Sequence, residues 1–452
     1  MKITFIGGGS LRLIPILRGV LAECPQVFED SELRFFDLNC DRAQAVIDVL
    51  KNAPEFSNVK KCNLVLPSTM DEALTDIDIC YITMGIRKQP HNTLAAIESS
   101  QRGIISSDQL SLTGSFLGIQ LGKIVWNIAE RLAKLSPNAL MLIFANPVAV
   151  YSSMIERFLG IKALGICGGF NNHRYDLTRI FGNEEYTHDC DVVAAGVNHF
   201  SFILRGTFKQ EDIYGSLAPR LLNDSWKNII PEENFILREG IDILYETYRQ
   251  SNYLIFSTEM DGLYHASPQR IDVLQRRLTP DANLFDPIAA QQNSLKSIEE
   301  NFNILFEAAK NTQQEGLYNH KLFATNTKDI TIPILKAYAG IEKMRIVASG
   351  VNNGAISNMP NNAAVEYTMD IEGKKITPVE NQFVPEPFYD VISKLSLSQT
   401  ILGEAIAKHD HKLFAEALKV YPYCNNELVC KLFDIFSDSL DEEMLKARAF
   451  FE

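Results

Sequence analysis

Short apolar runs alternate with longer amphipathic stretches through the first half of the chain. Residues 2–6 are apolar and precede a helical stretch at 11–21, and the next apolar run, 33–36, ends at Asp37. A second helical stretch covers 118–135. Four more apolar runs follow the first two, at 64–66, 77–82, 140–144 and 163–166. Strands that alternate with helices are typical of a parallel sheet with helices on both faces. We therefore predict a doubly wound α/β sheet.

The pattern changes after residue 196. Helical segments dominate from about 232 to 320, and the last segment, 386–452, has the spacing of amphipathic helices. Two strands are expected between these segments, at 344–348 and 363–369. The second half is therefore predicted to be α+β and mostly helical.

The length of 452 residues favours two domains. We place the first at 1–195 and the second at 196–452. Because no Pro/Gly/Ser linker separates them, we expect the domains to pack tightly, with the functional site at their junction. The apolar faces of the C-terminal helices predict a homo-oligomer, either a homodimer or a homotetramer.

The composition narrows the class of protein. Hydrophobic residues make up 46% and charged residues 22%, as in an ordinary globular chain. A net charge of −13 argues against nucleic acid or an anionic membrane as a partner. No run approaches 18 apolar residues, so no membrane span is expected. The eight cysteines show no C-x-x-C pair, which favours reduced thiols and a cytoplasmic location.

A glycine turn follows the first predicted strand. Gly7, Gly8, Gly9 and Ser10 match the start of a dinucleotide fingerprint, although Arg12 takes the place of the third glycine. Asp37 ends the second strand, where a carboxylate can accept both ribose hydroxyls, which favours NAD over NADP. Gly85, after the fourth strand, is a further candidate for cofactor binding. A tight turn with a solvated aspartate is the alternative.

Two possible metal ligands follow later strands. Cys167 comes directly after the run 163–166, and His199 comes after the apolar run 192–197. A thiolate and an imidazole can fix one divalent transition metal, and strand ends on one sheet edge can converge. The alternatives are a buried cysteine and a hydrogen-bonded histidine of the core.

Several polar residues near the same edge are candidates for substrate contacts or proton transfer. Asn146, in an Asn-Pro segment, can bind sugar hydroxyls or simply form a turn. Arg87 can neutralise an anionic substrate or lie in a solvated loop. The dense titratable segment 257–265 contains Asp261 and Tyr264 as candidates for a general base, with a hydrated loop as the alternative. Asp108, near an expected glycine turn at Gly114, is a second candidate carboxylate.

Taken in order, these motifs resemble glycoside hydrolase family four. The likeness covers residues 2 to about 425 and includes Gly196-Val197-Asn198-His199 and the segment 351–360 leading into Val365-Glu366. The generic lactate and malate dehydrogenases, which share the Rossmann-type fold expected here, lack the 351–360 motif and the Cys plus Asn-His pair.

The resemblance implies a glycosidase that depends on NAD and a divalent metal, usually Mn²⁺, and acts on a small carbohydrate. In such enzymes NAD⁺ oxidises C3 of the sugar, and the metal polarises the new ketone and acidifies C2. A base then removes the C2 proton, the C1 substituent leaves by elimination, water adds, and the hydride returns to C3. By position, Cys167 and His199 would hold the metal, Asn146 and Asn198 would hold sugar hydroxyls, and Asp261 or Tyr264 would be the base.

The chain departs from the family in two places. Gly168-Gly169 stands where members carry Asn or His after the metal cysteine, and the segment 108–114 replaces a glycine-rich one. The sequence therefore leaves open the leaving-group acid and whether the substrate is a glycoside or a 6-phosphoglycoside. Two alternatives remain: a plain NAD-dependent dehydrogenase of a hydroxy acid or sugar acid, and a non-catalytic NAD-binding sensor.

Overall fold

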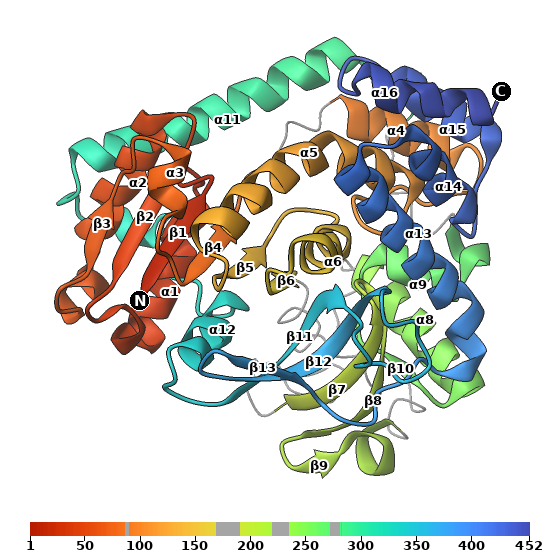
Figure 1. Cartoon of the computed structure of the whole chain (residues 1–452), viewed down its shortest axis with the longest axis horizontal. Coiled ribbons are helices and arrows are strands. Elements are labelled where there is room, and N and C mark those ends of the chain that lie inside the picture. The colour runs from red at the N-terminus through yellow and green to blue at the C-terminus, as the bar shows by residue number, and fades with distance from the viewer. Residues whose placement is uncertain (86–89, 169–189, 219–234, 272–280, 282) are drawn as a thin grey trace.

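The structure, a computed structural model, describes residues 1–85, 90–168, 190–218, 235–271, 281 and 283–452 (Figure 1). The predicted residue Arg87 lies outside the described residues. None of the helices in these ranges is long and apolar enough to cross a membrane.

The first half of the chain forms a parallel sheet with the strand order β3-β2-β1-β4-β5-β6. Its strands are β1 (Lys2–Ile6), β2 (Glu32–Phe36), β3 (Asn63–Val65), β4 (Ile79–Ile82), β5 (Leu140–Ile143) and β6 (Ala163–Gly165). Its helices are α1 (Leu13–Glu23), α2 (Cys40–Lys51), α3 (Met70–Leu74), α4 (His91–Ser100), α5 (Leu112–Leu135) and α6 (Val148–Leu159). This is the strand order of a dinucleotide-binding sheet, in which ligands bind beyond the carboxyl ends of the strands.

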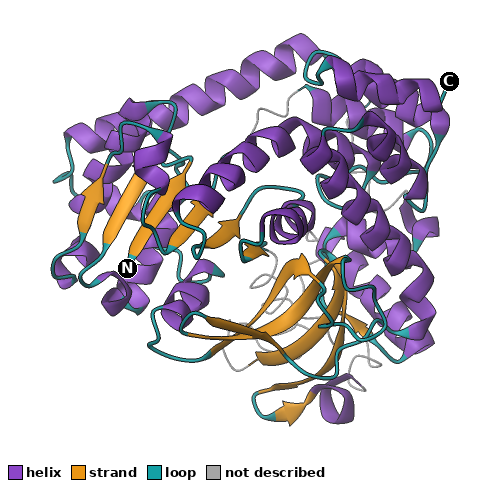
Figure 2. Cartoon of the chain, viewed as in Figure 1, coloured by secondary structure: helices purple, strands orange, loops and turns teal. Residues whose placement is uncertain are grey.

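The second half continues the same sheet with antiparallel strands. These strands are β7 (Cys190–Val197), β8 (Phe200–Phe208), β9 (Glu211–Asp212), β10 (Leu254–Ile255), β11 (Met344–Val351), β12 (Ala364–Glu372) and β13 (Lys375–Pro378). Pairing of Ser349 on β11 with Gly165 on β6 joins the two halves, so the described strands form one 13-stranded sheet. Figure 2 shows both groups of strands with helices around them.

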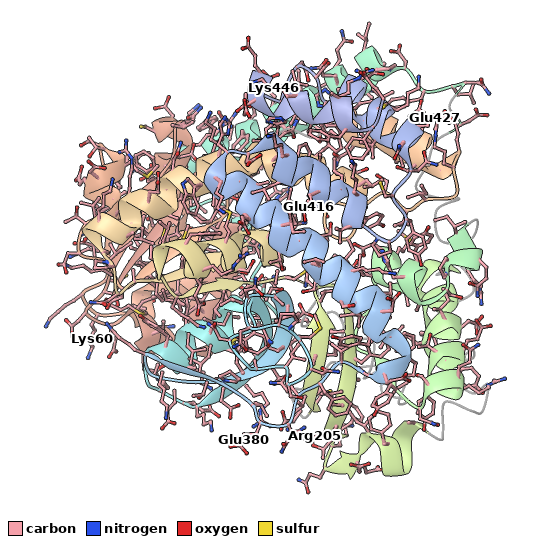
Figure 3. The ribbon with its side chains drawn as sticks, turned by 45° about the vertical axis from the view of Figure 1, so that its right-hand side comes forward. Lys60, Arg205, Glu380, Glu416, Glu427 and Lys446 are labelled. Carbon is pink, nitrogen blue, oxygen red and sulfur yellow. The ribbon has the colours of Figure 1, made fainter. Side chains whose placement is uncertain are left out.

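The helices of the second half form most of the right-hand and upper parts of Figure 1. They are α8 (Phe235–Ser251), α9 (Met260–Ala266), α11 (Pro287–Lys310), α12 (Thr331–Tyr338), α13 (Tyr389–Lys408), α14 (His411–Val420), α15 (Asn426–Ile435) and α16 (Glu442–Leu445). Helix α11 packs against α2, and α13 packs against α6. At the lower edge of the side-chain view, Arg205 on β8 donates to the backbone oxygens of Glu380 and Asn381 (Figure 3).

The predicted fold class is confirmed, with differences in detail. Helix α5 begins at Leu112 rather than Gly118, because the Ser111 hydroxyl accepts the N–H of Gly114 and caps the helix. The expected turn at Gly114 is therefore wrong, since this residue lies in the first turn of α5. Strand β8 was not anticipated, although its buried, apolar start pairs with β7 and positions the turn between them.

Candidate active site

The predicted metal ligands, Cys167 and His199, lie together. Cys167 follows β6, and His199 is the second residue of a two-residue turn that joins β7 to β8. The Sγ of Cys167 lies 3.5 Å from Nε2 of His199. His199 has φ +70°, a conformation that costs energy outside glycine and is concentrated at functional sites.

Helix α9 packs directly against the backbone of this turn. A Cβ atom at Gly262 would lie only 1.8 Å from the carbonyl oxygen of His199. Only glycine therefore allows α9 to approach this closely, and the approach places the preceding residue, Asp261, beside the imidazole. The alternative interpretation of this segment, a hydrated loop, is contradicted, because Asp261 lies in α9 and is 3% exposed.

Asp261 accepts four hydrogen bonds. Its Oδ1 lies 2.9 Å from Nδ1 of His199 and 3.0 Å from the N–H of Gly262. Its Oδ2 accepts the Ser107 hydroxyl at 2.7 Å and the N–H of Leu110 at 3.1 Å. The carboxylate thus fixes the histidine ring with Nε2 toward Cys167, as carboxylates do for metal-binding histidines.

The pKa values of this pair follow from burial and charge. Burial alone would raise the pKa of Asp261, but the charge of His199 and the hydrogen bonds of His199, Ser107 and Leu110 outweigh burial and lower it. Burial alone would lower the pKa of His199, but the charges of Asp261 and Cys167 raise it well above its ordinary value. Asp261 is therefore held as an anion that supports His199.

Tyr264 points to a different partner. Its hydroxyl donates to the backbone oxygen of Gly103 at 3.2 Å, and the residue is 2% exposed. Burial and the neighbouring Tyr423 raise the pKa of Tyr264. On the same helix, burial lowers the pKa of His265 to about 4, and its Nδ1 lies 2.5 Å from the backbone oxygen of Asp261. Tyr264 and His265 both pack against the ring of Tyr423.

Two partly exposed carboxyl groups remain near the site. Asp108 precedes the Leu110 N–H that binds Asp261, and Glu259 lies just before α9. Burial raises the pKa of Glu259; the charge of His199 opposes this shift, while those of Asp261 and Asp108 add to it. These interactions place Glu259 within electrostatic range of the Cys–His pair.

The side-chain amides of Asn146 and Asn198, the predicted substrate contacts, are held by opposite ends: Asn146 by its oxygen and Asn198 by its nitrogen. Gln109 donates its Nε2 to Oδ1 of Asn146 at 2.9 Å, and its own Oε1 accepts the N–H of Val148. Asn198 instead donates its Nδ2 to Oε2 of Glu366 at 2.6 Å. Asn146 therefore keeps its amino group for a ligand, whereas Asn198 keeps its carbonyl oxygen.

The sequence did not reveal several of the supporting residues. Ser107 and Leu110 lie 154 and 151 positions before Asp261 in the chain, so no local pattern connects them. Glu366 lies 168 positions after Asn198. Glu366 follows the segment 351–360, a motif already noted in the sequence, and this motif was the available signal that Glu366 belongs to the site.

A cavity of about 770 Å³ lies at the carboxyl ends of β1, β2 and β4, a size that suits a cofactor. Among its lining residues are the predicted Gly7, Gly9, Ser10, Asp37 and Gly85. Apolar side chains from α5 and α11 also line the cavity: Leu121, Ile124, Ile128 and Phe302. The shape and lining fit a dinucleotide with an apolar wall for its base.

The glycine turn uses its first N–H groups internally. The N–H groups of Gly7 and Gly8 both donate to the Phe36 oxygen, at 3.0 and 2.9 Å. The N–H of Gly9 donates to Oδ2 of Asp37, and that of Ser10 donates to the Gly7 oxygen, each at 2.9 Å. Gly7 has φ +87°, which favours glycine there. A bound pyrophosphate would therefore meet the chain further on, at the start of α1.

The Cys–His pair fits one transition-metal ion. Bonds of about 2.3 Å to sulfur and about 2.1 Å to nitrogen, at an angle of about 90–110°, separate two ligands by about 3.1–3.6 Å. The observed 3.5 Å falls in this range. Among the described residues, no group of three or more His, Cys, Asp and Glu side chains is arranged to hold a metal. A metal on this pair would thus keep open positions for other ligands.

The fold and the site together are those of an α/β enzyme that combines a dinucleotide-type cavity with a Cys–His pair whose spacing fits a metal ion. Two family models match the chain: "Family 4 glycosyl hydrolase" over residues 2–182 and "Family 4 glycosyl hydrolase C-terminal domain" over residues 194–424. The chain belongs to family 4 of the glycosyl hydrolases, as the sequence motifs predicted. A glycoside hydrolase is therefore favoured over a plain dehydrogenase or a non-catalytic sensor.

Individual relatives agree with this assignment. The chain is 24% identical to an alpha-galactosidase of Bacillus subtilis (strain 168) over 444 residues, covering 96% of each chain. It is 22% identical to a 6-phospho-beta-glucosidase of Escherichia coli (strain K12), covering 84% of this chain and 81% of the relative. The solved 6-phospho-beta-glucosidase of Thermotoga maritima, with manganese, NAD⁺ and glucose-6-phosphate, has a TM-score of 0.72 and 18% identity, over 98% of this chain and 100% of the other.

Proposed function

We propose that this protein hydrolyses a glycoside or 6-phosphoglycoside by NAD-dependent oxidation at C3, deprotonation at C2 and elimination at C1, with a divalent metal such as Mn²⁺. The observation that carries the proposal is the Cys167–His199 pair, which follows strands of the same sheet as the dinucleotide-type cavity. The Thermotoga maritima relative, which contains manganese and NAD⁺, supports the choice of cofactors. When bound, NAD accepts and returns the C3 hydride, and the metal polarises the C2 and C3 oxygens.

The adenosine side of NAD is assigned to the cavity around Gly7, Gly8, Gly9, Ser10 and Asp37. Asp37 already accepts the N–H of Gly9, and its carboxylate is available to the ribose hydroxyls at the cavity wall. Gly85 lines the same cavity and leaves open space beside the cofactor.

The pyrophosphate is assigned to the N-terminus of α1. The N–H groups of Leu11 and Arg12 come next along the chain, at a helix start that favours anions. The Arg12 guanidinium adds positive charge there. It is 34% exposed, lies over the Phe144 ring and forms an ion pair with Asp329 at 2.8 Å.

Cys167 and His199 are the proposed metal ligands, and Asp261 is assigned to orienting His199. Its four hydrogen bonds and deep burial make Asp261 a poor base, because its lone pairs are already occupied. Tyr264 donates its hydroxyl proton to the backbone oxygen of Gly103. Of the two bases that the resemblance suggested, neither has a free proton-accepting atom beside the metal ligands.

The proton-transfer groups are instead assigned to Asp108 and Glu259. Both are partly exposed, so both can reach a sugar bound between the two halves of the chain. The raised pKa of Glu259 favours its protonated form, as a leaving-group acid requires, which replaces the residue missing at Gly168. Asp108 is then the candidate base for the C2 proton.

The substrate is a small carbohydrate whose hydroxyls meet Asn146 and Asn198. These amides offer one donor and one acceptor, respectively. Arg87 is retained as a candidate for a phosphate or another anionic group of the substrate. The relatives include enzymes for both unphosphorylated and 6-phosphorylated sugars, so both substrate classes belong in the test.

The remaining assignments concern organisation. Residues 1–195 would bind NAD, and residues 196–452 would supply substrate contacts and the oligomer interface, although strand β7 (Cys190–Val197) runs across this division. Leu284, before α11, is 83% exposed, and Ile288, in the first turn of α11, is 68% exposed, which supports a homodimer or homotetramer. Eight free cysteines favour the cytoplasm. Neither nucleic acid nor membrane is expected as a partner.

The deciding experiment combines the protein, NAD⁺ and Mn²⁺ with nitrophenyl glycosides and their 6-phosphates. A glycosidase of this kind releases nitrophenolate without net NADH, whereas a dehydrogenase accumulates NADH with each turnover. Running the reaction in D₂O tests the elimination route, because deprotonation at C2 introduces solvent deuterium there. Nitrophenolate release with no label at C2 would contradict the mechanism and leave the glycosidase activity standing.

A further inference from the structure

The side chain of Asn198 is buried with one half of its amide unsatisfied. Asn198 is 2% exposed, and its Nδ2 donates to Glu366. Its Oδ1 is buried and has no hydrogen-bond partner within the part of the chain that the structure describes. Native proteins rarely keep such an atom, and where they do, a ligand, ion or water commonly satisfies it. This oxygen lies in the same two-residue turn as the proposed metal ligand His199.

Glu366 determines which end of this amide is left over. A carboxylate can only accept hydrogen bonds, so it selects the amino group of Asn198 and excludes the carbonyl oxygen. Its other oxygen accepts the Ser201 hydroxyl at 2.9 Å. Glu366 is 6% exposed and lies on β12, directly opposite Gly196 of β7, two residues before Asn198. The sheet therefore holds the carboxylate beside the turn.

The proposal rests on the proposed function and adds a specificity rule to it. We propose that Glu366 is a positioning residue that fixes the Asn198 carbonyl oxygen as a hydrogen-bond acceptor, so that the site requires a donating hydroxyl on the substrate sugar at that point. Asn146 provides the contrast, because Gln109 occupies its carbonyl oxygen and leaves its amino group as a donor. One substrate hydroxyl must donate, whereas the one that meets Asn146 needs only to accept.

Sugar analogues separate these two requirements. Fluorine can accept a weak hydrogen bond but cannot donate one, so a fluoro sugar fails at Asn198 as badly as the deoxy sugar does. The probes are the monosaccharide released by wild type and its monodeoxy and monofluoro analogues, with binding measured calorimetrically on protein loaded with NAD⁺ and Mn²⁺. We expect one hydroxyl position where both analogues bind about 10- to 100-fold more weakly than the parent.

A double-mutant cycle then connects that position to Glu366. Asn198→Ala and Glu366→Leu should each abolish the preference for the parent sugar at that hydroxyl, and the double variant should bind no more weakly than either single one. Glu366→Gln should restore most of the preference, because its amide oxygen still accepts from Asn198. Ser201→Ala is the matched control: it removes the other hydrogen bond to Glu366 and should bind like wild type.

A second measurement tests the orientation of the amide without any sugar. In protein labelled with ¹⁵N-asparagine, the Asn198 amino signal, assigned through Asn198→Asp, should be shifted and protected from exchange in wild type and Glu366→Gln. It should lose both properties in Glu366→Leu, provided that the other asparagine signals remain dispersed.

The outcomes separate the two claims. Additive binding losses for Asn198→Ala and Glu366→Leu, or an unchanged amide signal in Glu366→Leu, would overturn the role of Glu366. A protein that hydrolyses no glycoside yet shows the Glu366-dependent signal would contradict the proposed function and leave the positioning of Asn198 intact.

Discussion

The carboxylate of Asp261 offers the sharpest test of the proposed metal site. The perturbation is Asp261→Asn, which keeps the shape of the side chain and removes its charge. In the wild-type structure the carboxylate accepts four hydrogen bonds, two on each oxygen, and one of them fixes the His199 ring. An asparagine has a single oxygen, so one pair of these bonds must change.

The better orientation keeps the asparagine oxygen toward His199 and Gly262. Its amino group then faces Ser107, whose hydroxyl can turn to accept, and the N–H of Leu110, which cannot. A buried donor left unpaired costs about 1–3 kcal/mol, so we expect apo protein to lose about that much stability. The hydrogen bond from His199 is then accepted by a neutral amide instead of a carboxylate. Loss of a carboxylate partner of a metal-binding histidine lowers metal affinity about 10- to 100-fold, or about 1.4–2.7 kcal/mol.

Mn²⁺ binding can be measured by calorimetry or from the electron paramagnetic resonance signal of the free ion. Thermal unfolding of apo protein gives the stability effect. Ser107→Ala serves as the control, because it removes one hydrogen bond to Asp261 and leaves that to His199, and it should weaken Mn²⁺ binding much less. If folded Asp261→Asn protein binds Mn²⁺ as tightly as wild type does, the carboxylate does not support a metal-binding histidine.

Three further predictions follow from the structure. Cys167→Ser should abolish turnover while NAD still binds, and EDTA should mimic the variant in wild type until Mn²⁺ is restored. Asp37→Ala should weaken NAD binding by about 1.5–3 kcal/mol in a fluorescence titration, and unchanged affinity would refute the ribose assignment. Glu55 pairs with the buried Arg18 through both oxygens, at 2.6 and 2.9 Å. Burial alone would raise the pKa of Glu55, but Arg18 outweighs burial and lowers it. The pair therefore stabilises the fold above the unfolded pKa of about 4.3, and this stability is lost as the pH falls through the lowered folded value. Glu55→Gln should accordingly lower the unfolding temperature at pH 7, with the difference from wild type shrinking in acid; a difference that persists at the lowest pH would contradict the ion pair.

The sequence predicted those parts of the molecule whose signals are local. Alternating apolar runs identified the parallel strands, because a strand buried on both faces needs a continuous apolar segment. Cys167 and His199 were recognisable because each follows a strand, and strand ends in such a sheet converge at one edge. The distance between them confirms that they come together.

The supporting contacts were beyond the reach of local patterns. Asp261 was predicted as a candidate base, with a hydrated loop as the alternative. In the structure, the missing Cβ of Gly262 lets α9 pack against the turn, and the carboxylate is buried. Its partners Ser107 and Leu110 come from a segment about 150 positions away. Such contacts depend on how β8 and α9 pack against the first half, and polar residues at these spacings have no periodicity.

Phe302 on α11 links the cofactor cavity to the second half of the chain. This side chain lines the cavity, and the Arg42 guanidinium of α2 stacks over its ring, 3.7 Å from the centroid. A dinucleotide bound there would touch both the strand ends of the first half and a helix of the second. At a concentration of 100 times its dissociation constant, a ligand of the folded state adds about 2.7 kcal/mol of stability. The bound cofactor would thus hold α11 against the sheet, and removal of NAD should make α11 more accessible to a protease.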